Sequence, residues 1–301
     1  MKSPTNIAAS VRQRLQNIQH RDGRSFHELL QYYAMERFLY RLSLSEYKEQ
    51  FILKGALMLR VWGASQVRPT MDIDMLGITS NDAGNINAQF QQIISLVVPD
   101  DGLVFDPDSI KTEAITEDAD YKGLRVLLIC KLGSARANLQ VDIGFGDFVY
   151  PKPSRMTFPT LLEFPAPDLL GYSRESAIAE KFDAMLTLGM LNSRMKDFYD
   201  IWLLSRQFEF RGEILIEAIR GTLENRSTHL TEEVVSFTPD FMQAKQIQWK
   251  AFQRRMIGVI MPDSFQEVAE HVRNFLMPVV SALRTYGMPP KQWKALGPWV
   301  N

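Results

Sequence analysis

The chain has 301 residues, of which 46% are hydrophobic and 23% charged, and its net charge is −1. This composition is that of a globular protein and excludes a disordered, collagen-like or fibrous chain. A single cysteine, Cys130, excludes an internal disulfide framework and a thiolate zinc site within one chain. No apolar run is long enough to span a bilayer, and the N-terminus lacks the apolar stretch of a signal peptide, so we expect a cytoplasmic protein without a membrane segment.

The charge is unevenly distributed along the chain. Residues 1–50 sum to +3, residues 241–301 to +5, and residues 51–240 to −9. An acidic centre between basic ends suits a protein that holds divalent cations centrally and a polyanion at its periphery. A chance distribution explains the same sums equally well.

The N-terminal half is predicted to be a mixed α+β domain. Apolar residues at helical spacing predict helices over 7–18, 26–42 and 82–97, and one or two helical turns over 56–62. Alternating or short apolar runs predict strands over 51–53, 71–78, 103–105, 110–115, 123–132 and 138–145. The short connections within 103–145 favour antiparallel pairing there.

The C-terminal half is predicted to be helical. Five prolines between positions 151 and 167 predict a linker over 151–173. The expected helices beyond it cover 174–190, 195–207, 211–224, 239–256 and 263–277. The predicted organisation is a mixed-sheet domain with N-terminal helices (1–150), a proline-rich linker (151–173) and a helical domain (174–301).

Two carboxylates, Asp72 and Asp74, lie on the predicted strand 71–78. A period of two places both on one face, where close like charges favour a divalent cation between them. Asp142 lies on another apolar strand, LQVDI, and three carboxylates converge if the two strands are neighbours, as two-metal phosphoryl transfer requires. Solvated acids on exposed strands are the alternative, and Asp147 competes for the third position.

A second feature is the segment Lys54-Gly55-Ala56, which precedes a short predicted helix. A glycine at a strand-to-helix turn lets backbone N–H groups approach a phosphate closely. A lone glycine can also mark a turn and nothing more.

The helical half contributes one lysine and two acids. Lys181 lies in an amphipathic helix and could hold a triphosphate as a point charge, but a solvated lysine beside Glu180 and Asp183 is the competing interpretation. Asp197 and Asp200 are three residues apart and share a helical face, and surface ion pairs explain them adequately. Walker A, G-x-S-x-G, H-E-x-x-H and G-x-G-x-x-G motifs are absent, and the four histidines lack metal-ligand spacing.

Together these segments resemble the AbiEii/AbiGii-type toxins of the nucleotidyltransferase superfamily, whose members share a DNA polymerase β-like catalytic core. The resemblance covers about residues 20–260, and the order of five motifs is more specific than any one of them. The matching segments are FILKGALMLRVWGASQVRPTMDIDMLG, LQVDIGFGD, EKFDAML, RMKDFYDIWLL and QWKAFQRR.

The resemblance implies an α+β nucleotidyltransferase domain followed by a helical domain, with the site in the cleft between them. It implies a toxin, a monomer that transfers a nucleoside monophosphate from an NTP to an acceptor and releases pyrophosphate. RNA such as the tRNA 3′ end is the expected acceptor, and a cognate antitoxin and a role in phage defence are implied as well.

Roles carried over from the family fall on particular residues. Asp72, Asp74 and Asp142 would bind Mg²⁺, or Mn²⁺ in its place, and Asp142 would also activate the acceptor hydroxyl. The nucleotide would be bound by Lys54, Gly55, Ala56, Thr70 and Lys181. Asp197 would complete the site from the helical domain.

Two departures from the family pattern matter. Ala56 stands where the family usually has Gly or Ser, which keeps a backbone contact but excludes a hydroxyl contact. Met195-Lys196 stands where the family often has Arg directly before Asp, so either Asp197 or Asp200 could be the functional acid. The alternatives to RNA nucleotidylation are protein nucleotidylation and a degenerate, non-catalytic binding or scaffold module; Ala56 favours the module, and the three acids argue against it.

Two further expectations concern regulation and acceptor binding. The hydroxyl of Thr70 should point toward Asp72, where a phosphate group would stop transfer, although a threonine here can simply bond the local backbone. Lys245, Lys250 and Arg254 are expected on one helix face as RNA contacts, against the alternative of a solvated face over a core stripe.

Overall fold

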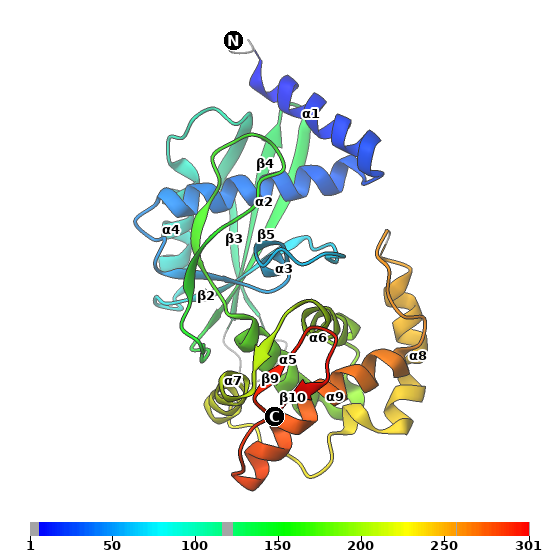
Figure 1. Cartoon of the computed structure of the whole chain (residues 1–301). Helices are drawn as coiled ribbons and strands as arrows, with labels where there is room; N and C mark the ends of the chain where they lie inside the picture. The colour runs from blue at the N-terminus through cyan, green and yellow to red at the C-terminus, as the bar shows by residue number, and fades with distance from the viewer. Residues whose placement is uncertain (1–5, 116–122, 257, 301) are drawn as a thin grey trace. The chain divides into compact units, whose positions relative to one another are not determined.

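The computed structural model describes residues 6–115, 123–256 and 258–300. The chain divides into two compact units: unit 1 comprises residues 1–62, 70–146 and 154–171, and unit 2 comprises residues 63–69, 147–153 and 172–301. Figure 1 shows a mixed sheet with helices in the first unit and a group of helices in the second. The expected α+β class is confirmed.

Unit 1 is built on a mixed sheet with the strand order β3-β4-β5-β2-β1-β7-β6. In chain order its strands are β1 (Phe51–Lys54), β2 (Asp72–Gly77), β3 (Leu103–Ile115), β4 (Gly123–Leu132), β5 (Ala135–Phe145), β6 (Ser154–Thr157) and β7 (Asp168–Gly171). As expected, β3–β4 and β4–β5 are antiparallel, whereas β5 and β2 run parallel. The parallel pair is possible because α4, β3 and β4 form a long connection between the two strands.

The helices of unit 1 are α1 (Ile7–Asp22), α2 (Phe26–Leu44), α3 (Leu57–Val61) and α4 (Ala83–Ser95). Side-chain oxygens of Asn6, Ser25 and Asp82 cap the first turns of α1, α2 and α4. In Figure 1, α2 runs across the sheet, and Phe38 of α2 stacks on Phe90 of α4 with ring centroids 5.4 Å apart. Alternate residues of β4 and β5 complete this core, among them Val126, Leu128, Cys130, Leu139, Val141 and Ile143.

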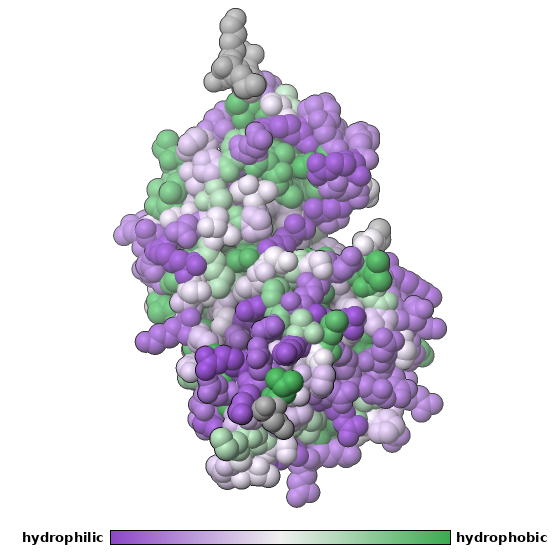
Figure 2. Space-filling view, in the orientation of Figure 1, coloured by the Kyte–Doolittle hydropathy of each residue, from purple (hydrophilic) through white to green (hydrophobic). Residues whose placement is uncertain are grey.

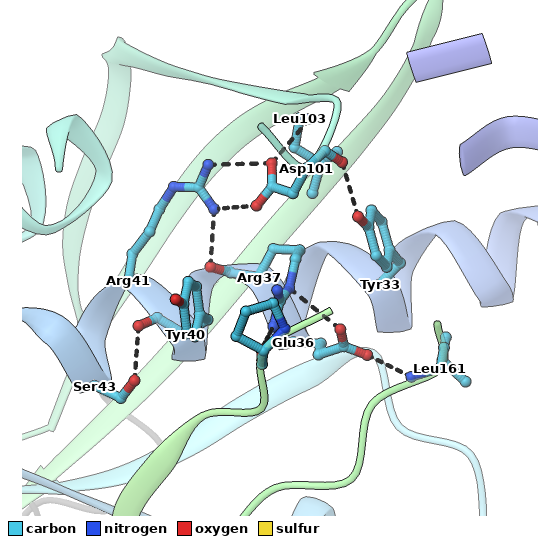
Figure 3. Close-up of polar contacts among 10 residues, drawn as sticks. Tyr33, Glu36, Arg37, Tyr40, Arg41, Ser43, Asp101, Leu103 and Leu161 are labelled. Carbon is cyan, nitrogen blue, oxygen red and sulfur yellow. Dashed lines mark hydrogen bonds and ion pairs between the residues drawn. The ribbon is translucent and has the colours of Figure 1, made fainter. Parts of the chain in front are cut away.

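Buried polar contacts anchor α2 to two loops of unit 1 (Figure 3). Arg41 makes two hydrogen bonds to the Asp101 carboxylate, at 2.7 and 3.2 Å. The Glu36 carboxylate accepts a 2.7 Å bond from the N–H of Leu161. Burial raises the pKa of Glu36 to about 7, although Arg37 and the Leu161 N–H oppose that rise.

Two sequence expectations about the strands differ from the structure. The separate strands expected over 103–105 and 110–115 are one strand, β3, whose pairing with β4 shifts register between Asp106 and Lys111. Within the expected linker, residues 154–157 and 168–171 form β6 and β7 and pair with each other. Pro153 and Pro167 directly precede these two short strands and lie outside their ladders, so the proline cluster is compatible with both strands.

Unit 2 contains α5 (Arg174–Leu188), α6 (Met195–Gln207), α7 (Gly212–Asn225), α8 (Pro239–Gln253) and α9 (Phe265–Thr285), with short 3₁₀ turns at Gly189–Leu191 and Val235–Phe237. Three two-residue strands pair in the order β10-β9-β8: β8 (Phe210–Arg211), β9 (Gln292–Trp293) and β10 (Trp299–Val300). Aromatic side chains fill the centre, for example Phe198 against Phe265 at 5.0 Å. Helix α9 continues through Pro278 to Thr285, beyond the predicted end at residue 277.

The surface of unit 2 on the face shown in Figure 2 is mainly hydrophilic. Within the described ranges, no helix is both long and apolar enough to cross a membrane.

Candidate metal and nucleotide site

The three aspartates predicted as metal ligands come together in unit 1. Parallel pairing of β2 with β5 sets Asp74 opposite Asp142, so that both side chains lie on one face of the sheet. Asp72 lies two residues earlier on the same face. Oxygen atoms of all three carboxylates lie within 4.8 Å of one another, and each residue is half-buried. Close carboxylate oxygens are the donor set that a hard divalent cation takes.

The carboxylates occupy the middle of a charged row that crosses the sheet. Lys54 of β1 is the register partner of Asp74, and Arg125 of β4 is the register partner of Asp142. Arg125 donates from Nε and Nη2 to the two Asp142 oxygens, both at 2.8 Å. Gln140 donates to the same oxygens at 3.2 and 3.1 Å. A cation therefore stands on each side of the acidic pair, and Asp142 is held in a fixed orientation.

Sequence reasoning missed Arg125, although a signal was present. The strands β4 and β5 meet at a two-residue turn, Gly133-Ser134, and pairing outward from that turn sets Arg125 opposite Asp142. Counting from the turn would have identified the partner.

Gly55 meets two separate demands at the turn after β1. Its φ is +71°, a left-handed conformation that glycine adopts at little cost. A Cβ atom built there would collide with the carboxylate of Asp74. Ala56, which follows, has φ −68° and is buried at the start of α3, so its methyl group is accommodated. The close approach of the backbone to this carboxylate excludes any side chain at position 55.

Thr70 points toward the carboxylates, as expected from its spacing. Its hydroxyl donates a short hydrogen bond to Asp72 Oδ1, and its N–H donates to the Tyr32 hydroxyl at 3.4 Å. The residue is buried. Thr70 therefore orients Asp72, and phosphorylation at this position would require the hydroxyl to be exposed first.

In unit 2, Lys181 belongs to a buried ion network. Its Nζ lies 2.9 Å from Asp197 Oδ1 and 3.0 Å from Asp200 Oδ2. Arg68 makes a bidentate contact with Asp200, at 2.8 and 3.0 Å. Both Asp197 and Asp200 thus contact the lysine, and Asp200 alone also binds the arginine. Two positive and two negative charges meet here.

The charges in this network stabilise one another. Burial by itself would raise the pKa of Asp200, but Arg68 and Lys181 hold it below its ordinary value. Burial likewise would lower the pKa of Lys181, but Asp197 and Asp200 raise it. Lys181 and Asp200 are therefore both charged at neutral pH.

The predicted neighbours of Lys181 bind a different cation. Asp183 and Glu180 lie 3.0 and 3.7 Å from Arg226, and Asp147, the competitor for the third metal position, lies 2.8 Å from it. Asp147 belongs to unit 2, and its carboxylate pairs there with Arg226. The interpretation of Lys181 as a solvated lysine beside Glu180 and Asp183 is wrong.

One basic residue predicted as an RNA contact is not on the surface. Lys245 is buried, and its Nζ donates to the Met190 carbonyl at 2.7 Å. Lys250 and Arg254 are exposed. The three therefore do not form one solvated face, because a long lysine side chain can fold inward to bind a carbonyl.

The family model of the nucleotidyl transferase AbiEii toxin, of a type IV toxin–antitoxin system, matches residues 37–271. The chain belongs to this family. No curated protein matches the sequence.

Two solved structures show the same fold. One, described as a proposed nucleotidyltransferase from H. pylori, has a TM-score of 0.51 and 14% identity over 88% of this chain and 100% of that one. The other, JHP933 from Helicobacter pylori, has a TM-score of 0.51 and 15% identity over 87% of this chain and 95% of that one. The AbiEii-family chain is thus a toxin-like nucleotidyltransferase, and its family pairs it with an antitoxin.

Proposed function

We propose that this AbiEii-family protein transfers a nucleoside monophosphate from an NTP to a hydroxyl group of an RNA acceptor, such as the tRNA 3′ end. The observation that carries the proposal is the cluster of Asp72, Asp74 and Asp142 beside the Gly55 turn. Pyrophosphate leaves as the new phosphodiester bond forms, and the acceptor hydroxyl loses its proton.

A divalent ion fits this cluster, because three half-buried carboxylates offer oxygen atoms within 4.8 Å of one another, and hard cations take such oxygen ligands. Asp72, Asp74 and Asp142 would bind Mg²⁺ or Mn²⁺. When bound, such ions neutralise charge that develops on the attacking and leaving oxygens.

The chain's own residues prepare the site for this reaction. Thr70 orients Asp72, and Arg125 together with Gln140 orients Asp142. Asp142 is proposed to accept the proton of the acceptor hydroxyl, while Arg125, which binds both of its oxygens, fixes the orientation of the carboxylate.

The nucleotide phosphates are proposed to approach the backbone at Lys54, Gly55 and Ala56. The left-handed turn at Gly55 brings the backbone against the Asp74 carboxylate with no side chain between them, so phosphates held there would lie beside the proposed metal ligands. Thr70 is proposed to contribute to nucleotide binding by fixing the carboxylate of Asp72. Ala56 supplies a backbone N–H, and the departure from Gly or Ser leaves this contact intact.

Lys181 is proposed to contact the triphosphate, and Asp197 to keep the lysine in place. The family resemblance supports these roles, as does the 2.9 Å contact between the two side chains. Asp200 then serves to hold Lys181 and Arg68 together.

The decisive experiment incubates the protein with Mg²⁺ and each of the four α-labelled NTPs, together with total RNA or total protein. We expect label in the RNA fraction, dependent on Asp72 and Asp74. Label in the protein fraction would instead identify a protein nucleotidylating enzyme. Neutralisation by the antitoxin is tested in the same assay, by adding the product of the gene adjacent to the toxin gene.

A further inference from the structure

A groove of about 380 Å³ lies on unit 1, beside the carboxylates. Strands β3, β4 and β5 and the first turns of α2 line it. Lys111 and Arg136 line it as positively charged residues, and His27 lines it as well. No Asp or Glu lines the groove in the part of the chain that the structure describes. A polyanion is therefore the ligand that its charge favours.

The groove continues into the carboxylate site. Asn138 and Gln140 line the groove, and they alternate along β5 on the face that carries Asp142. Gln140 is also the side chain that donates to both Asp142 oxygens. At the neighbouring strand, Met71 lines the groove and directly precedes Asp72. At about 3.3 Å per residue, Arg136 lies about 20 Å along the strand from Asp142.

The floor of the groove is fixed in position before any ligand arrives. Gln31 of α2 is buried and donates to the carbonyls of Met71 and Asn138, at 3.1 and 2.8 Å. Asn138 in turn accepts a 2.9 Å bond from Arg136 Nε. The same helix therefore holds both the groove and the start of β2, which carries the carboxylates.

The groove and the Gly55 turn lie on opposite sides of the acidic pair. The strand order places β5, β4 and β3 on one side of β2, and β1, which leads into Gly55, on the other. The nucleotide is assigned to the Gly55 side. The groove on the far side of the carboxylates is thus placed to hold the other substrate.

We propose that this groove binds the strand of RNA that leads to the reacting hydroxyl, with Lys111 and Arg136 on its phosphates. This inference rests on the proposed function and names where the acceptor lies. Exposed lysine and arginine side chains supply phosphate contacts. The amides of Asn138 and Gln140 can pair with base edges, and the half-buried side chains of Leu127 and Ile129 give the bases an apolar floor.

The first experiment measures RNA binding without turnover. A fluorescein-labelled tRNA and a labelled single-stranded RNA of mixed sequence are titrated with protein in the absence of NTP, at several salt concentrations. For the Lys111→Ala/Arg136→Ala variant we expect a 10- to 100-fold weaker Kd. Losing two phosphate contacts should also reduce the slope of log K against log salt by about 1.4.

The matched control removes the same charge from unit 2. Lys291 and Lys294 are exposed, and the Lys291→Ala/Lys294→Ala variant should keep both the wild-type Kd and the wild-type salt slope. Equal effects of the two double variants, or none from the groove variant, would overturn the proposal. Displacement of the RNA by poly-glutamate at matched charge concentration would show a site for acidic protein and would also overturn it.

A second experiment separates this proposal from the proposed function. With transfer as the readout, the groove variant should raise the KM for RNA at least tenfold and leave the KM for NTP within twofold. An equal rise in the KM for NTP would place the triphosphate in the groove and defeat the inference. Asp74→Asn should abolish transfer and retain RNA binding. If the wild-type protein transfers no label but binds RNA in the groove, the proposed function is wrong and the proposed RNA site stands.

Discussion

Two clusters of charged side chains, one in each unit, contrast sharply. In unit 1, three half-buried aspartates share one face of a sheet, and Arg125 binds both oxygens of one of them, Asp142. In unit 2, Arg68 and Lys181 contact Asp197 and Asp200, and Asp200 is only 1% exposed. Removing one member of a buried ion pair leaves an uncompensated charge, whereas half-buried carboxylates are accessible to a cation from solvent. We therefore expect substitutions in the first cluster to affect chemistry first, and substitutions in the second to affect stability first.

The largest expected effect is on chemistry in unit 1. Asp74→Asn should lower transfer by about a thousandfold or more, because one charged ligand is lost where charge develops. The free energy of unfolding should be unchanged or higher, because repulsion among the acids falls. Label transfer and urea denaturation measure the two quantities. Near wild-type transfer by this variant would show that the carboxylates are not the catalytic cluster.

The opposite pattern is expected in unit 2. Asp200→Asn removes the carboxylate that Arg68 and Lys181 share, and a broken buried pair costs about 3–5 kcal/mol of folding stability. Asp168→Asn is the control, because Asp168 contacts Arg155 at the surface and such pairs contribute about 1 kcal/mol or less. Urea denaturation monitors both variants. A loss no larger than that of the control would mean that the network does not stabilise unit 2.

Two glycine substitutions separate the cost of a positive φ from the cost of a steric clash with a carboxylate. Gly55→Ala and Gly133→Ala both place a side chain at positive φ, at a cost of about 1–2 kcal/mol. Only at Gly55 does the new methyl group meet Asp74, whereas nothing lies within 4 Å of the methyl group at Gly133. We expect a greater loss of stability and a loss of transfer for Gly55→Ala, and wild-type transfer for Gly133→Ala. Equal transfer by both would argue against close packing of the turn on the carboxylate.

The smallest expected effect is on the pH dependence of folding stability. Here one group in each unit is expected to contribute a slope of opposite sign. Burial raises the pKa of Glu36 in unit 1 to about 7, so stability falls as pH rises from about 4.5 to 7, where only the unfolded chain has lost its proton. In unit 2, burial and Arg206 lower the pKa of His271 to about 4, so stability falls as pH drops from about 6.5 to 4.

These two slopes have opposite signs and partly cancel in the wild-type protein. Glu36→Gln should unmask the loss at low pH, and His271→Gln the loss at high pH. Urea denaturation at intervals from pH 4.5 to 7.5 gives the slopes. Parallel profiles for the two variants would contradict the opposite signs.

Much of this architecture could be predicted from local patterns. A period of two placed Asp72 and Asp74 on one face, and helical spacing located α1, α2 and the five helices of unit 2. Asp142 was identified as the third carboxylate, and the parallel pairing of β2 with β5 brings it there. These features could be predicted because each is visible in a short stretch of sequence: a local period of apolar residues, or one acidic residue within an apolar strand.

The features that were missed depend on partners distant in sequence. Lys181 was weighed against the acids next to it, but its partners are Asp197 and Asp200 on the following helix. Arg68 and Asp200 are separated by more than a hundred residues, and no local period links them. Lys245 matched a helical face, yet periodicity cannot show that a lysine turns inward to the Met190 carbonyl. Tertiary packing decides these contacts.

The position of β5 in the sheet also determines when the site can exist. Asp74 is synthesised early, but its register partner Asp142 belongs to a strand that must enter between β4 and β2. A nascent chain on the ribosome therefore carries two of the three carboxylates and an unpaired β2 edge until residues 135–145 have emerged. Any product truncated before β5 lacks the third carboxylate of the candidate site, so premature termination yields fragments with an incomplete cluster.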